Sequence, residues 1–232
     1  MLRFFDEKRW AALQSVRARP GLIVVGASPR AAVTAVEEEL AKGAFVVGAR
    51  GVAPREFFER EEAVTGEAVL FASTDLRMTL AEAARIRLAR KRLTVTVPGS
   101  GDVVELIQRL RDERAAGVPL KDLSAIVAMR VHPALCGSCL APDEEAARAF
   151  GDAARQKGPG CTSCAGQGHA GELAFAEILE ISTKTRLRFE APEFSSPRIT
   201  ELAEEEEGFL SFHDQLVDAV MMGRISAADA GL

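Results

Sequence analysis

Short apolar runs alternate with amphipathic stretches along the first hundred residues. Four short, continuous runs predict strands buried on both faces: Gly21–Val25, Ala44–Val47, Ala68–Phe71 and Leu93–Val97. Polar and apolar residues at helical spacing predict helices between them: Asp6–Arg17, Pro29–Ala41, Pro54–Glu62 and Thr79–Arg90. Strands that alternate with helices form a mostly parallel sheet, so the pattern predicts an α/β fold.

The pattern changes after the fourth strand. Asp102 is a suitable N-cap for a helix in which the apolar positions from Val103 to Leu110 share one face. We expect further helices over Leu120–Met129 and Pro142–Arg155, and a strand or a helix over Leu173–Ile181.

Composition and charge narrow the class of protein. The 232 residues suffice for one large domain or two small ones, and 47% hydrophobic with 27% charged residues is typical of a globular chain. Charge is net positive up to Arg130 and net negative after it, which favours two domains, 1–130 and 131–232. The overall charge of −5 argues against nucleic acid as the main partner, because that affinity needs clustered cations.

Neither a membrane span nor a signal peptide is predicted. No apolar run approaches the roughly 20 residues that cross a bilayer, and the start, MLRFFDEKRW, becomes charged where a signal peptide needs an apolar segment. We therefore expect a cytoplasmic protein without direct membrane insertion, in which cysteines serve as ligands more readily than as disulfides.

Two C-x-x-C pairs carry the strongest chemical signal in the chain. Cys136 with Cys139, and Cys161 with Cys164, have the spacing of a four-cysteine structural zinc site. The alternatives are a redox dithiol and unrelated buried cysteines. His132 and His169 lie near the pairs as further ligands or as hydrogen-bond donors to the ligands, although four thiolates already complete the zinc tetrahedron. His213 is expected to pack or to lie on the surface.

The order of motifs from Met129 onward resembles a known family. Met129-Arg-Val-His-Pro-Ala-Leu-Cys leads into the first pair, Cys161-x-x-Cys-x-Gly-x-Gly168 forms the second, and Phe175-Ala-Glu-Ile-Leu-Glu180 follows. This order resembles the C-terminal end of the type II secretion and type IV pilus assembly ATPases. Gly208–Ser211 and Gly223–Ser226 are similar to the starts of that family's last two helices, whereas Glu172 stands where the family has arginine.

The resemblance implies a reduced RecA-like core of the P-loop NTPase type before the zinc-clipped, mostly helical C-terminal region. In that alignment the phosphate loop falls on 26–34, where Gly26, Arg30 and Thr34 are the residues left to contact a nucleotide. The loop lacks the lysine that reaches the β and γ phosphates, and Pro29 removes an N–H donor.

Other parts of the family's nucleotide site are also missing. Ala72-Ser-Thr74 occupies the place of the catalytic glutamate, with Asp75 nearby as an acid or, more simply, a helix N-cap. The family's histidine box falls on Pro98–Gly101, which has no histidine and is either an anion-binding turn or a plain one. The segment between Val47 and Glu67 is too short for the family's acidic and arginine residues.

These losses predict a pseudo-ATPase that binds partners and does not hydrolyse ATP. The resemblance implies an active motor ATPase, the inner-membrane platform protein or a ring of its own copies as partners, and a position at the inner face of the membrane. The alternatives are a nucleotide binder or weak NTPase with an unconventional phosphate loop, and a zinc-binding adaptor unrelated to secretion. The family's N-terminal recruitment domain is not present, so a fragment or a specialised accessory protein is expected.

Two charged stretches remain. Arg85, Arg87 and the run Arg90–Arg92 form a basic cluster, read either as a solvated helix end or as a surface for an acidic protein or a nucleotide. Glu204–Glu207 is expected to be a solvated helix end or loop.

Overall fold

The structure is a computed structural model of the 232-residue chain. It describes the following residues: 3–29, 33–42, 46–48, 52–60, 68–72, 75–84, 92–98, 101–115, 122–190, 201 and 209–232.

The chain divides into two compact units that interleave along the sequence. The cysteine unit comprises Met1–Glu7, Arg130–Phe175 and Leu210–Leu232. The sheet unit comprises Lys8–Met129 and Ala176–Phe209. The separation into consecutive domains 1–130 and 131–232 stays a prediction.

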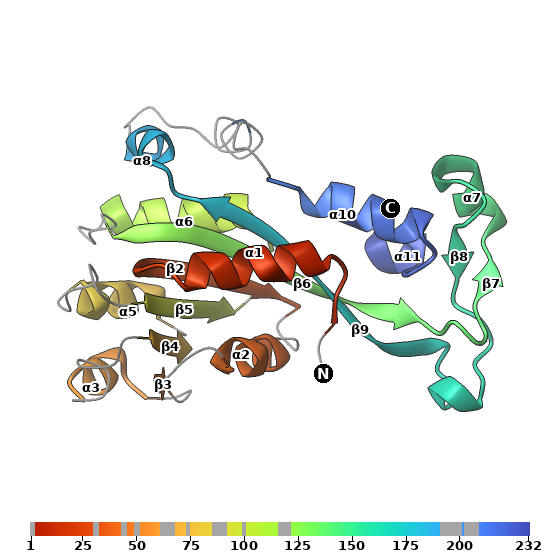
Figure 1. Cartoon of the computed structure of the whole chain (residues 1–232), viewed down its shortest axis with the longest axis horizontal. Helices are drawn as coiled ribbons and strands as arrows, with labels where there is room; N and C mark the ends of the chain where they lie inside the picture. The colour runs from red at the N-terminus through yellow and green to blue at the C-terminus, as the bar shows by residue number, and fades with distance from the viewer. Residues whose placement is uncertain are drawn as a thin grey trace. The chain divides into compact units, whose positions relative to one another are not determined.

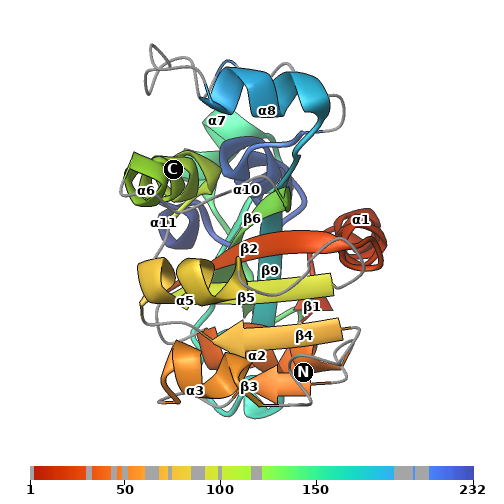
Figure 2. The ribbon, with the colours of Figure 1, turned by 90° about the vertical axis from the view of Figure 1, so that its left-hand side faces the viewer.

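Four parallel strands form the centre of the sheet unit, and they lie side by side in the order β2, β5, β4, β3 (Figures 1 and 2). Their bounds are Gly21–Ser28, Arg92–Pro98, Ala68–Ala72 and Val46–Gly48. Leu22 pairs with Leu93, and Leu93 pairs with Val69 in the next strand. Leu93 and Val69 are buried, as expected for strands covered on both faces, and the predicted parallel α/β sheet is confirmed.

Three more strands extend the sheet in the order β1-β9-β6-β2. They are β1 (Arg3–Phe4), β9 (His169–Glu180) and β6 (Leu123–Leu135). The N–H of Ile181 donates to the Ser124 carbonyl and that of Cys136 to the Gly168 carbonyl, so β6 and β9 run antiparallel. The sheet is therefore mostly parallel, with an antiparallel pair whose strands each contribute residues to both units.

The predicted helix over Leu120–Met129 is wrong, because the described part of this segment begins strand β6. The five residues Ala125–Met129 are all fully buried. Burial of consecutive residues means that both faces of this strand are covered, which explains an apolar run without helical periodicity. Leu173–Ile181, for which strand and helix were both open, lies almost wholly in β9.

Helices accompany the strands of the sheet unit: α1 (Glu7–Arg17), α2 (Val33–Ala41), α3 (Pro54–Phe58), α5 (Leu76–Ala83), α6 (Val103–Ala115) and α8 (Thr183–Glu190). Helix α2 packs on β2 and β4, and α3 packs on α5. The predicted N-cap at Asp102 is confirmed, since its carboxylate accepts the N–H of Glu105 at 2.8 Å. Apolar faces such as Leu13, Leu40 and Leu106 are fully buried.

The cysteine unit contains short elements around two turns: β7 (Ala141–Pro142), α7 (Glu144–Phe150), β8 (Arg155–Gln156), the 3-10 turn η3 (Thr162–Cys164), α10 (Phe212–Met221) and α11 (Ala227–Ala230). The helix expected over Pro142–Arg155 is shorter than predicted. Asp143 caps α7, Gly151 ends it at a φ of +92°, and Arg155 pairs in a small antiparallel ribbon. The two helices expected near the C-terminus are present as α10 and α11.

No helix in the described ranges has both the length and the apolar character that crossing a bilayer requires.

Candidate metal centre

Two turns in the cysteine unit hold the four cysteines. Cys136 follows the last residue of β6, and its carbonyl accepts the N–H of Cys139 at 3.1 Å, which closes the first turn. In the second turn Cys161 precedes η3 and Cys164 ends it, with the Cys164 N–H donating to the Cys161 carbonyl at 3.2 Å. The structure therefore brings the predicted cysteines together from segments about 25 residues apart.

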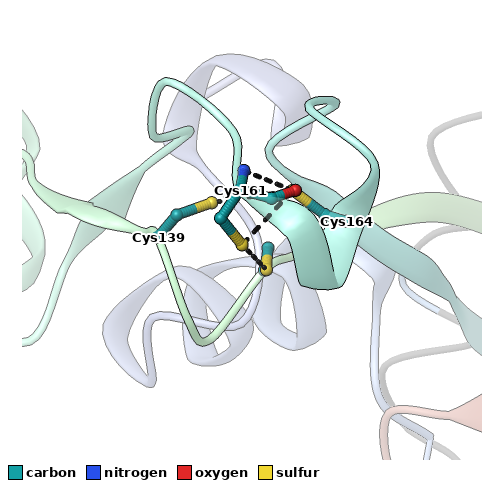
Figure 3. Close-up of side chains that lie close together, drawn as sticks. Cys139, Cys161 and Cys164 are labelled. Atoms are coloured by element: carbon teal, nitrogen blue, oxygen red, sulfur yellow. Dashed lines mark hydrogen bonds between the residues drawn. The ribbon is translucent and has the colours of Figure 1, made fainter.

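The four sulfur atoms converge on one point (Figure 3). The Sγ–Sγ distances are 3.7 Å for Cys136 to Cys161, 3.7 Å for Cys139 to Cys164 and 3.8 Å for Cys161 to Cys164, and all four sulfurs lie within 4.8 Å of one another. A tetrahedral ion with metal–sulfur bonds of about 2.3 Å separates its sulfurs by about 3.8 Å, which matches these distances. A disulfide needs about 2.05 Å, and all four cysteines are free.

Backbone N–H groups point at one of the sulfurs. The N–H groups of Cys161 and Gly168 donate to Cys164 Sγ at 3.2 and 3.1 Å. Hydrogen bonds from Cys161 and Gly168 lower the pKa of Cys164 to about 6, against the effect of burial. Burial and the neighbouring thiols raise the pKa of Cys139 to about 12. Because a cation at the centre favours thiolates, it would offset the repulsion that four converging sulfurs otherwise experience.

The second turn depends on glycine. Gly168 has a φ of +71°, and a Cβ at this position would lie 2.7 Å from the Gly158 carbonyl oxygen. A Cβ at Gly158 would overlap the carbonyl oxygen of Cys139. These close approaches allow the backbone to wrap around the sulfurs, as the C-x-x-C-x-G-x-G pattern suggests.

The two nearby histidines contact helix α11. His132 Nδ1 lies 3.0 Å from the backbone carbonyl oxygen of Asp229, and His169 Nε2 lies 3.1 Å from Asp229 Oδ2. Ser226 Oγ also donates to Asp229 Oδ2, at 2.6 Å. Neither histidine belongs to the cysteine cluster, and both instead hold the last helix of the cysteine unit. Sequence reasoning missed Asp229, although Ser226-x-x-Asp229 is a local capping pattern that marks the start of α11. His213 is exposed on α10.

Chemically, four thiolates around one ion leave no coordination position for water or substrate. Cys136 and Cys164 are 2% and 7% exposed, and Cys139 and Cys161 are half-buried, so the centre is partly shielded from solvent. The arrangement can hold a metal ion and join two chain segments, which is a structural task.

The residues of the phosphate-loop region lie between β2 and α2. Gly26 is inside β2, paired with Val97 of β5, and Thr34 is exposed in the first turn of α2. Arg30 lies outside the described residues. A strand followed by a helix is the expected context for a phosphate loop, but among the described residues no cation lies close to Thr34 in sequence.

The remaining residues that the sequence singled out and that the structure describes lie outside the cysteine centre. Asp75 is the N-cap of α5 and accepts the Met78 N–H at 2.9 Å, which confirms that interpretation. Glu172 is exposed on β9. The basic cluster is outside the described residues apart from Arg92, and the same holds for Glu204–Glu207.

The chain is similar to known proteins in structure and not in sequence. No protein-family model matches the chain, and no curated protein matches it by sequence. Solved structures do match: the ATPase DotB of Legionella pneumophila aligns with 95% of the chain at a TM-score of 0.61 and 10% identity. The chain shares the fold of this ATPase structure. DotB of Yersinia pseudotuberculosis aligns with 100% of the chain at a TM-score of 0.58 and 11% identity, and the pilus retraction motor PilT, solved with ADP, with 94% at 0.58 and 13%.

The structural matches confirm, at the level of fold, the resemblance to secretion and pilus motor ATPases. The chain spans 62 to 63% of the length of these three structures. Sequence identities of 10 to 13% show a shared fold and not a shared activity, so the activity depends on the residues of this chain.

Proposed function

We propose that this protein is a non-hydrolysing relative of the secretion and pilus motor ATPases that acts by binding protein partners. The observation that carries the proposal is the segment from Gly26 to Thr34, which contains no lysine although it joins a buried strand to a helix. Phosphoryl transfer depends on positioning and charge stabilisation, and without the lysine, the acid and the arginines little catalytic power remains.

The start of helix α6 supports this proposal. Its first N–H donors are hydrogen-bonded to carboxylates of the same chain: Val103 N–H donates to Glu177 Oε2 at 2.9 Å, and Gly101 N–H donates to Glu105. Glu177 is 6% exposed, so its carboxyl group already occupies this buried helix start. An anionic ligand there would have to displace those carboxylates. Sequence reasoning had placed Glu177 only within a family motif.

The cysteine centre has a structural role in this proposal, with zinc as the metal. Zinc accepts four thiolates in a tetrahedron without strain. It does not change oxidation state, and a metal that only joins two chain segments does not need to. The partners follow from the resemblance: an active motor ATPase, the inner-membrane platform protein, or further copies of this chain in a ring. The protein would then work in the cytoplasm, held at the inner face of the membrane by its partner.

The test combines hydrolysis and partner recovery. Phosphate release from Mg-ATP by the purified chain is measured beside PilT as a positive control, and affinity-tagged chain is used to recover a motor ATPase or platform protein. We expect no release above buffer, and recovery of one of these partners. Release that is lost in Thr34→Ala would instead support a weak NTPase, and recovery only of proteins unrelated to secretion would support the zinc-adaptor alternative.

A further inference from the structure

A cavity of about 610 Å³ lies wholly within the sheet unit, between helix α1 and the segment that joins β9 to α8. Ala12 and Val16 of α1 and Ile178 of β9 contribute apolar wall. The start of β2, at Pro20, also lines the cavity, whereas the phosphate-loop region follows the other end of that strand. The cavity is therefore separate from the region that a nucleotide would occupy.

The charged residues that line this cavity are mostly basic. Among the described residues that line it, three are arginines, Arg9, Arg19 and Arg186, and one carries a carboxylate, Glu180. Arg186 donates to the Leu123 carbonyl at 2.8 Å, a contact that fixes the position of its guanidinium. In a chain with a net charge of −5, this local excess of arginine is a distinctive feature.

The Glu180 carboxylate is in an exchangeable ion pair with Arg19. Arg19 donates to Glu180 at 2.6 Å, and the two side chains are 58% and 51% exposed. Exposed ion pairs contribute little to stability, so a ligand anion can replace the Glu180 carboxylate at small cost. Arginine suits this exchange, because its planar fork binds a carboxylate or phosphate through two parallel hydrogen bonds.

We infer that this cavity binds a small amphipathic anion, with its carboxylate or phosphate at Arg19 and Arg186 and its apolar body against α1 and the end of β9. The volume lies within the range of small-molecule sites, and such sites combine mostly apolar walls with a few polar groups that orient the ligand. The site would let a metabolite control a protein that otherwise acts through partners, which goes beyond the function proposed above.

The test is calorimetric titration of the full chain with decanoate, and with decanol as an uncharged molecule of the same length. We expect saturable binding of one decanoate per chain, with decanol at least about tenfold weaker, because hydrogen bonds to a charged group carry the difference. Arg19→Gln should weaken decanoate binding, whereas Glu180→Gln should strengthen it by removing the competing carboxylate. Both variants break the same ion pair, so a merely structural effect would shift the affinity in the same direction in both.

Arg77→Gln, at an exposed position on α5 away from the cavity, is the matched control and should leave the affinity unchanged. Equal binding of decanol and decanoate, shifts of the same sign in Arg19→Gln and Glu180→Gln, or no binding of decanoate would each overturn the inference. Binding of an acidic peptide without binding of decanoate would also overturn it, in favour of a protein partner at this surface.

Discussion

At the residue scale, the cysteine sulfurs lie where a tetrahedral ion requires them, so each should be needed. Cys136→Ser or Cys161→Ser should remove most of the metal affinity, and zinc in small sites contributes on the order of 10 kcal/mol. We expect loss of bound zinc by elemental analysis and a melting temperature lower by about 10 °C or more. Ser163→Ala, an exposed neighbour in the same turn, is the control and should retain both. A Cys136→Ser variant with unchanged zinc content and melting temperature would contradict the structural metal centre.

Gly168 offers a second test of the centre, through the backbone. Gly168→Ala places a side chain at a φ of +71° and directs its Cβ toward the Gly158 carbonyl oxygen, 2.7 Å away. The left-handed conformation alone costs about 1 to 2 kcal/mol. We expect denaturant unfolding to show a loss of about 2 to 4 kcal/mol together with weaker zinc binding. Gly137→Ala, where a Cβ would meet nothing within 4 Å, should change stability by less than about 0.5 kcal/mol.

His132 should make stability depend on pH. Burial lowers the pKa of His132 below its ordinary 6.5, partly offset by its hydrogen bond to the Asp229 carbonyl. The unfolded chain therefore binds the proton at higher pH than the native protein, so stability is complete above about pH 6.5 and falls as the pH drops toward the native pKa. The difference between the unfolding free energies at pH 7.5 and pH 5.5 should be smaller in His132→Asn than in the unsubstituted protein. The asparagine amide can donate to the same carbonyl but does not titrate. An equal pH dependence in both proteins would refute this role.

At the scale of elements, Asp75 distinguishes a cap from a catalytic acid. Its carboxylate accepts the Met78 N–H at the start of α5. Asp75→Ala should lower the free energy of unfolding by about 1 kcal/mol, whereas Asp75→Asn should retain it, because asparagine caps a helix equally well. Chemical denaturation of both variants provides the measurement. Equal destabilisation by the two substitutions would show that the charge, not the cap, matters at this position.

Most elements of the sheet could be predicted because apolar runs flanked by turn residues are a local signal. The local residue pattern is enough to predict the strand around Leu93 and the helix that Asp102 caps. The segment Ala125–Met129 does not, because a long apolar stretch fits a buried helix as well as a central strand, and its neighbours in the sheet decide between them. The two-residue β1 pairs with Leu173, about 170 residues away, so no local pattern could predict it.

The candidate metal centre was more predictable than its surroundings. In each C-x-x-C turn, the short spacing in sequence brings two sulfurs close together. Two such turns supply the four sulfurs of a tetrahedral site. The contacts of His132 and His169 with Asp229 join three separate segments, and only the folded chain brings them together. For the same reason the cavity beside α1, which combines residues from Arg9 to Phe209, had no sequence signal.

At the scale of the whole molecule, the fold shared with DotB and PilT occurs with a strand-to-helix segment, 26–34, that contains no lysine. The fold therefore supplies a framework of strands and helices, while the function proposed for it rests on partner binding. The two units interleave along the chain, so the cysteine unit is complete only with the C-terminal segment Leu210–Leu232.

Thermal unfolding of the zinc-loaded protein with and without millimolar Mg-ATP tests the central claim most directly. A nucleotide at about 100 times its dissociation constant would stabilise the native state by about 2.7 kcal/mol, which raises the melting temperature by roughly 5 to 10 °C for a chain of this length. The account predicts no shift, while PilT under the same conditions is stabilised. A clear upward shift that Thr34→Ala removes would contradict it and would establish nucleotide binding between β2 and α2.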